Sequence, residues 1–150
     1  CHFLLLWLTD PFKAICEMVR VTRQGGYVVA LAEPDYPARI DFPPALEPLG
    51  HFQQLSLKQQ GADVSMGRQL RRLFTQSGLV NVEAGVLGGQ WSAGFSSVDH
   101  ELEWQVMEQD LSGIVPSQEL SRLREIDRSA WMNGERVLFV PTFYALGQVP

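Results

Sequence analysis

The chain has 150 residues, of which 45% are hydrophobic and 19% charged, which is the composition of one soluble globular domain. Its net charge of −5 and its scattered basic residues argue against a nucleic-acid-binding surface. No apolar stretch reaches the roughly 20 residues of a membrane helix, and the N-terminal run lacks the flanks of a signal peptide. The few cysteines and histidines form no metal or disulfide pattern. We therefore expect a cytoplasmic protein without a metal site or membrane partner.

Residues 1–8, with the sequence CHFLLLWL, are predicted to form a buried strand. The chain does not begin with methionine, and an uncovered apolar strand would leave an adhesive sheet edge. We therefore expect a fragment of a longer protein. Its first strand would be covered by other segments, by a second copy in a homodimer, or by strand exchange.

A helix and a second strand follow. Asp10 can accept hydrogen bonds from the first helical turn, Pro11 suits the first helical position, and Gly25-Gly26 supplies a left-handed stop. The stretch from Tyr27 to Ala32 is continuously apolar, which predicts a strand buried on both faces in a parallel sheet. Such a strand–helix–strand unit should form a right-handed crossover.

The middle of the chain is interpreted as an insertion, a helix and a strand. Residues 34–61 contain five prolines followed by a short amphipathic pattern, so we expect a helical insertion there. Ser65 is expected to cap the next helix, which ends at Gly78. The buried face of that helix should consist of Met66, Leu70, Leu73 and Phe74. A strand is expected over 80–86, where apolar residues alternate.

Residues 95–135 are predicted to form a second helical insertion with two helices. The apolar face of the first should comprise Val98, Leu102 and Val106, with Trp104 and Met107. That of the second should comprise Leu120, Leu123, Ile126, Ala130 and Trp131. The last strand, from Arg136 to about Leu146, contains Pro141, which cannot donate to a ladder and indicates a bulge or an irregular strand end.

Three segments resemble the second half of the class I S-adenosylmethionine-dependent methyltransferases. They are FLLLWLTDP at 3–11, EMVRV at 17–21 and RQGGYVV at 23–29. The resemblance covers most of residues 1–95 and 136–148. It implies an α/β fold with an incomplete Rossmann-like methyltransferase sheet, made of strands four to seven, in which the last strand inserts antiparallel between the previous two. It also implies methyl transfer from S-adenosylmethionine to a small-molecule acceptor.

The glycine-rich turn that holds the cofactor in this family is not present in the sequence. No G-x-G-x-G occurs, and the glycines at 85–89 follow the wrong strand and open no helix. They are interpreted as a bend or a close backbone approach. We therefore expect the 150 residues alone to bind S-adenosylmethionine poorly or not at all.

The resemblance also implies cofactor-binding residues. Cys1, His2 and Phe3 fall where the family lines the methionine and sulfonium region, although a strand end without a role is an equal alternative. Trp7 aligns near the cofactor pocket of some relatives, with a core position as its alternative.

Two carboxylates, Glu33 and Asp35, follow the central strand, at the end where open parallel sheets bind ligands. Either could orient an acceptor hydroxyl or amine, or act as a general base. Asp35 could equally form a turn within EPDYP. Both are candidate catalytic residues.

The acceptor pocket is expected to involve Tyr36, Arg39, His51, Arg68 and Trp91. All but Arg68 come from the regions that usually shape that pocket in the family. His51 could instead be a surface residue, and Arg68 an ordinary solvent-exposed arginine.

A second interpretation comes from a different class of function. The chain could be a non-catalytic module that completes its sheet by pairing with another chain through the apolar edge of residues 1–8. A nucleotide-binding domain of dehydrogenase type is a weaker third interpretation, because the phosphate-binding glycine turn is absent.

Overall fold

The computed structural model describes residues 1–91 and 96–150, which divide into two compact units. Unit 1 consists of Cys1–Ala38, Gly61–Gly88 and Val140–Pro150, and unit 2 of Arg39–Gln60 and Gly89–Phe139. Each unit is described by itself. Across the described residues, no helix combines the length and the apolarity needed to cross a membrane.

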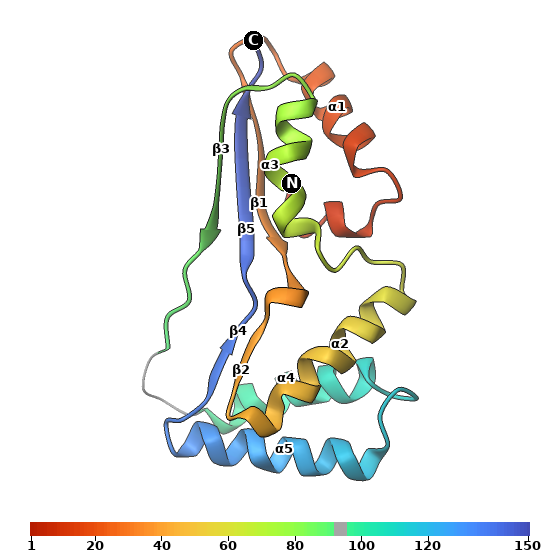
Figure 1. Ribbon diagram of the computed structural model, residues 1–150, viewed down its shortest axis with the longest axis vertical. Coiled ribbons are helices and arrows are strands. Elements are labelled where there is room, and N and C mark those ends of the chain that lie inside the picture. Colours follow the sequence, from red (N-terminus) through yellow and green to blue (C-terminus); the bar gives the residue numbers. More distant parts are fainter. Residues whose placement is uncertain (92–95) are drawn as a thin grey trace. The chain divides into compact units, whose positions relative to one another are not determined.

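Unit 1 contains a three-stranded sheet whose middle strand comes from the C-terminal end of the chain. β1 (Tyr27–Pro34), β5 (Thr142–Gln148) and β3 (Val80–Leu87) lie in the order β1-β5-β3, as Figure 1 shows. β5 runs antiparallel to both neighbours, with Leu146 opposite Val29 of β1 and Glu83 of β3. This is the placement that the resemblance predicted for the last strand.

Two helices of unit 1 were predicted with nearly correct bounds. In α1 (Pro11–Val21), the Asp10 side chain accepts a hydrogen bond from Lys13 N (2.9 Å). α3 (Met66–Gln76) contacts all three strands of the sheet. The four residues of its predicted apolar face are buried, namely Met66, Leu70, Leu73 and Phe74. Gly78 follows Ser77, the C-cap of α3, with a φ of 85°, the left-handed conformation that ends a helix without strain at a glycine. The predicted glycine stop of α1 is wrong, because that helix ends at Val21 and its C-cap Thr22 is extended, so Gly25 (φ 74°) belongs to the turn that follows.

The start of α3 differs from the expectation. The Ser65 side chain does not cap the helix. Its hydroxyl instead donates to Asp63 Oδ1 (2.8 Å), whose other oxygen accepts from Gln69 Nε2 (2.6 Å). Partial burial raises the pKa of Asp63, but the hydrogen bonds from Ser65 and Gln69 outweigh it and leave that pKa below its ordinary value.

The prediction that β1 is buried on both faces is wrong. Val28, Ala30 and Ala32 are buried, whereas Tyr27 and Leu31 are 58% and 55% exposed. The alternation arises because successive strand residues point to opposite faces, and α3 covers the face on which Ala30 lies.

The predicted strand over residues 1–8 is also wrong. Cys1 N donates to Val29 O (2.7 Å), Leu31 N to Cys1 O (3.0 Å) and Phe3 N to Ala32 O (3.0 Å), so the first three residues do run beside β1. The chain then turns at Phe3, whose φ is 48°, into a short 3-10 helix, η1 (Leu5–Trp7). Only Leu5 and Leu6 of the apolar run are buried, and they are buried by a turn rather than by a strand.

Unit 2 combines a small sheet with three helices. β2 (Ile40–Phe42) pairs antiparallel with β4 (Val137–Phe139). The helices are α2 (Glu47–Gln59), α4 (Ser97–Asp110) and α5 (Ser117–Met132). Two further 3-10 turns are η2 (Tyr36–Ala38), in unit 1, and η3 (Pro44–Leu46), in unit 2. The expected last strand is interrupted at Val140-Pro141, and its halves, β4 and β5, belong to different sheets.

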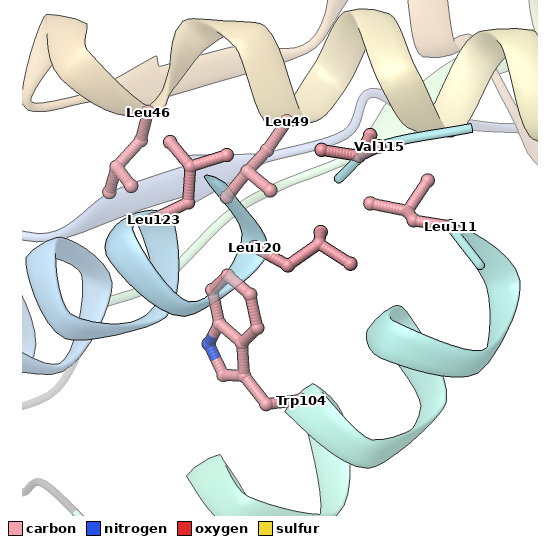
Figure 2. Packing of buried hydrophobic residues seen from close by; sticks show 7 residues of the cluster. All are labelled: Leu46, Leu49, Trp104, Leu111, Val115, Leu120 and Leu123. Carbon is pink, nitrogen blue, oxygen red and sulfur yellow. The ribbon is translucent and has the colours of Figure 1, made fainter. Parts of the chain in front are cut away.

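The hydrophobic core of unit 2 draws on all three helices (Figure 2). Its buried members are Leu46, Leu49, Trp104, Leu111, Val115, Leu120 and Leu123. The face predicted for α4 is partly wrong, because Val98, Leu102 and Val106 are exposed while Trp104 is buried. Trp104 has more apolar area to bury, and its indole N–H also donates to buried Asp127 (2.9 Å), which fixes the rotation of the helix.

Gly67 allows the first turn of α3 to approach the end of β1. A Cβ atom there would lie 2.6 Å from Glu33 O and 2.6 Å from a ring carbon of Phe143. We predict that Gly67→Ala lowers the free energy of unfolding by about 1–3 kcal/mol, measured by urea denaturation, because the backbone must shift. Gly88→Ala is the control, since nothing lies within 4 Å of its added carbon. Equal stability of the two variants would contradict this close approach.

Candidate functional site

The carboxyl end of β1 carries two buried carboxylates. Glu33 is 0% exposed, and its Oε1 accepts hydrogen bonds from Leu4 N and Leu5 N (both 2.9 Å). Its Oε2 accepts from Leu6 N (3.2 Å). N–H groups at the start of a helical turn have no partner within the turn, so the carboxylate satisfies them and holds η1 against the end of the strand.

Asp35 lies two residues further and is 1% exposed. Its two carboxylate oxygens accept hydrogen bonds from Nε and Nη2 of Arg68, in the first turn of α3. The hydrogen bonds and negative charge of Asp35 raise the pKa of Arg68, which therefore stays protonated. The backbone of Asp35 also starts the η2 turn by accepting from Ala38 N (3.2 Å), so the turn alternative holds alongside the ion pair.

The predicted cofactor residues lie on the segment that runs beside β1 and on the turn that Glu33 holds. Cys1 and Phe3 are joined to β1 by the backbone hydrogen bonds given above, and the rings of His2 and Phe3 lie 4.9 Å apart. Trp7, at the end of η1, is 45% exposed, so its alternative as a core residue is wrong. His2, Phe3 and Trp7 thus have exposed rings, and all three lie on residues 1–7, which Glu33 holds through its hydrogen bonds.

The predicted acceptor residues are divided between the two units. Tyr36 and Arg68 belong to unit 1, and the other three belong to unit 2. Tyr36 N donates to Val64 O (2.9 Å). His51 is exposed on α2. Trp91 donates from Nε1 to Leu138 O (3.2 Å) and meets the ring of Phe139 edge-on.

Arg39 belongs to a buried charge network in unit 2 that the sequence did not reveal. Arg39 Nη2 donates to Asp41 Oδ1 (2.9 Å), which also accepts from Arg136 Nη2 (2.7 Å). Arg136 Nε donates to Asp127 Oδ1 (2.6 Å). All four side chains are at most 7% exposed. Two arginines and two aspartates balance in charge, so the network is self-compensated and Arg39 has a structural role.

The second oxygen of Asp127 extends the same network. It lies 3.0 Å from His100 Nε2 and accepts from Trp104 Nε1 (2.9 Å). The partners come from segments as far apart as 41 and 136, so no local spacing indicates them. Only Arg39 and Asp41 carry a signal in the sequence, since both are charged residues flanked by apolar ones.

A hollow of about 350 Å³ lies between α4 and α5. It is lined by Ser97, His100, Glu101, Glu108, Ser121, Arg124, Glu125 and Arg128. Arg124 forms ion pairs there with Glu101 and with Glu108 (3.0 Å). The charged side chains that line the hollow therefore largely pair with one another. In residues 1–91 and 96–150, no three His, Cys, Asp or Glu side chains gather as metal ligands.

The chain was compared with known families, curated proteins and solved structures. No family model and no curated protein matches the sequence. Among solved structures, the chain is similar to phosphoethanolamine N-methyltransferase 2 of Haemonchus contortus, solved with phosphomonomethylethanolamine and S-adenosylhomocysteine. The TM-score is 0.45 and the sequence identity 12%, over 99% of this chain and 32% of the other. At most, this is a likeness in fold. This chain spans about a third of the length of that methyltransferase.

The hydrogen bonds of Glu33 predict a structural cost for its replacement. Glu33→Gln converts one acceptor oxygen into an N–H donor that faces backbone N–H groups, so we expect a loss of about 1–3 kcal/mol in the free energy of unfolding. Urea denaturation measures the loss. Glu83→Gln, on the exposed surface of β3, is the matched control and should leave the midpoint unchanged. An unchanged midpoint for Glu33→Gln would contradict the role of this carboxylate in holding η1.

Replacement of Asp127 tests whether the charge network of unit 2 is buried and stabilises the fold. Asp127→Ala leaves Arg136 buried beside an empty position, and removing one partner of a buried ion pair costs about 3–5 kcal/mol. Thermal unfolding should show a large loss of stability. Glu119→Ala removes the partner of Arg122 in an exposed pair on α5 and should scarcely change the transition. Similar effects for both variants would show that the network is not buried as described.

Proposed function

We propose that this chain forms the C-terminal part of an S-adenosylmethionine-dependent methyltransferase domain acting on a small-molecule acceptor. The observation that carries the proposal is the agreement between sequence and topology. The segments at 3–11 and 17–29 resemble that family, and the strand order β1-β5-β3 places the last strand antiparallel between the previous two. Under this proposal the sheet is the later part of a Rossmann-like sheet, with β1, β3 and β5 as its fifth, sixth and seventh strands.

The residues at the end of β1 fit part of a cofactor site. Exposed aromatic rings at Phe3 and Trp7 offer apolar contact area, while Glu33 fixes the backbone that carries them. The cofactor supplies an electrophilic methyl group. Binding also requires a glycine-rich turn, which these 150 residues do not contain.

In this mechanism the protein chiefly aligns the acceptor and excludes water, because methyl transfer needs no covalent intermediate on the enzyme. We assign positioning roles to both candidate catalytic carboxylates. Glu33 is fully buried and holds three N–H groups, and Asp35 has both oxygens on Arg68, so neither presents an oxygen to an acceptor proton. The aromatic and apolar side chains near residues 3–7 favour an acceptor that tolerates an apolar surrounding.

The alternative is a non-catalytic module that pairs with another chain. The exposed Tyr27 and Leu31 on the uncovered face of β1 favour it. Pairing through residues 1–8 is less favoured, because Cys1 and Phe3 already bond β1 and residues 5–7 form a turn. A module of this kind would show no affinity for the cofactor.

Calorimetric titration with S-adenosylmethionine and S-adenosylhomocysteine tests the proposal. We expect the longest natural protein that contains these 150 residues to bind both ligands, and the 150-residue chain to bind at least a hundredfold more weakly, because the glycine-rich turn lies outside it. In the longer protein, Trp7→Ala should weaken binding about tenfold, the effect of losing one stacked ring of about 1.4 kcal/mol. Phe12→Ala, on α1, is the control.

The outcomes separate the interpretations. Absence of binding by both proteins would contradict the methyltransferase proposal and favour the module. Equal binding by both would contradict the requirement for the glycine-rich turn.

A further inference from the structure

The ion pair between Asp35 and Arg68 engages only part of the arginine's guanidinium group. The guanidinium of Arg68 has five N–H groups, and Asp35 accepts from the one on Nε and from one on Nη2. The remaining three have no hydrogen-bond partner within the part of the chain that the structure describes. Although Asp35 is 1% exposed, the Arg68 side chain is 52% exposed, so these donors face outward.

The position of the guanidinium is fixed on both sides. Asp35 grips it through two parallel hydrogen bonds, an arrangement that restricts its rotation more than a single bond would. The backbone at Gly67 rests against Glu33 O and Pro34 O, which fixes the first turn of α3 to the end of β1. A preorganised donor loses little conformational entropy when it binds a ligand.

Further cations follow Arg68 along the same helix. The sequence of α3 is MGRQLRRLFTQ, with Arg68, Arg71 and Arg72 and no acidic side chain. Asp63, which accepts a hydrogen bond from Gln69 of the same helix, offsets one of these charges at the helix start. The planar fork of Arg68 suits the oxygen pair of a carboxylate or a phosphate.

A role in folding alone does not account for the geometry of this pair. Asp35 needs a charged partner because it is buried, but solvent screens a half-exposed guanidinium, so the pair adds little to the stability of the fold. The pair does, however, fix Arg68 beside the carboxyl end of β1 with part of its guanidinium in solvent.

We infer that Arg68 binds an anionic substituent, a carboxylate or a phosphate, on the methyl acceptor, and that Asp35 is the positioning residue that holds it. The inference rests on the proposed function for the identity of the bound molecule as an acceptor. It narrows the substrate class from small molecules in general to those that carry an oxyanion.

The test is an NMR titration of the 150-residue chain with inorganic phosphate and, separately, with sodium acetate, at constant ionic strength. We expect saturable shifts of the Arg68 Nε–H resonance and of the amides of residues 67–69. Arg68→Lys keeps a positive charge beside Asp35 but has no fork, so the affinity should fall about tenfold. Arg72→Lys, one turn further along α3, is the matched control and should retain the wild-type affinity.

Three results of this titration would overturn the inference. They are the absence of saturable shifts with both anions, an unchanged affinity in Arg68→Lys, and an equal loss in Arg72→Lys, which would indicate unspecific charge attraction. The amide spectrum of each variant shows whether it is folded, and Asp35→Asn provides a second variant that loosens Arg68 without removing it.

A parallel titration of the longest natural protein with S-adenosylhomocysteine separates this inference from the proposed function. Binding of anions without the cofactor product would leave the Arg68 site standing and contradict the methyltransferase proposal. Binding of S-adenosylhomocysteine without binding of anions would contradict the Arg68 site and leave the methyltransferase proposal standing. If Arg68→Lys weakens S-adenosylhomocysteine binding tenfold, the arginine holds the cofactor's carboxylate, which overturns its assignment to the acceptor.

Discussion

The pairing of β5 with two strands from distant parts of the chain is the constraint on which unit 1 depends. β5 is antiparallel to both β1 and β3, so neither neighbour has another strand partner in this sheet. Close packing supports the pairing, since a Cβ on Gly85 would meet the ring of Tyr144 at 2.8 Å and one on Gly147 would meet Leu79 at 2.9 Å. The position of the carboxyl end of β1, and of every group bound to it, therefore follows from the last residues of the chain.

The buried charges of the two units have different consequences. In unit 2, Asp41, Asp127 and the arginines that face them form a closed set in which each side chain satisfies another. In unit 1, Glu33 satisfies backbone N–H groups, and Asp35 grips an arginine that stays half exposed. A closed network stabilises a fold, whereas a buried carboxylate that directs an exposed cation leaves donors for a ligand. This difference places the candidate site at the end of β1.

Local signals in the sequence predicted much of the fold. Asp10-Pro11 correctly predicted the start of α1 and Gly78 the end of α3, and apolar periodicity correctly predicted the buried face of α3. Residues 1–8 were misassigned because an apolar run does not distinguish a strand from a turn, and the carboxylate that stabilises the turn lies 27 or more residues away. For α4, two apolar stripes at helical spacing competed, and the contact of Trp104 with Asp127 decided between them. Glu33 and Asp35 lie at the end of a strand as predicted, whereas the predicted acceptor residues are divided between the two units and their binding roles stay predictions. The pairing of Asp35 with Arg68 joins segments that share no motif.

The proposed function requires that the end of β1, with the segment that Glu33 holds, forms part of a cofactor site. Hydrogen–deuterium exchange of the longest natural protein that contains this chain, with and without S-adenosylhomocysteine, tests it most directly. We expect the ligand to slow exchange in residues 1–7 and 33–36, because a ligand bound there stabilises the hydrogen bonds between η1 and the strand end against local opening. Ligand binding that leaves exchange in both segments unchanged would contradict a cofactor site at this place.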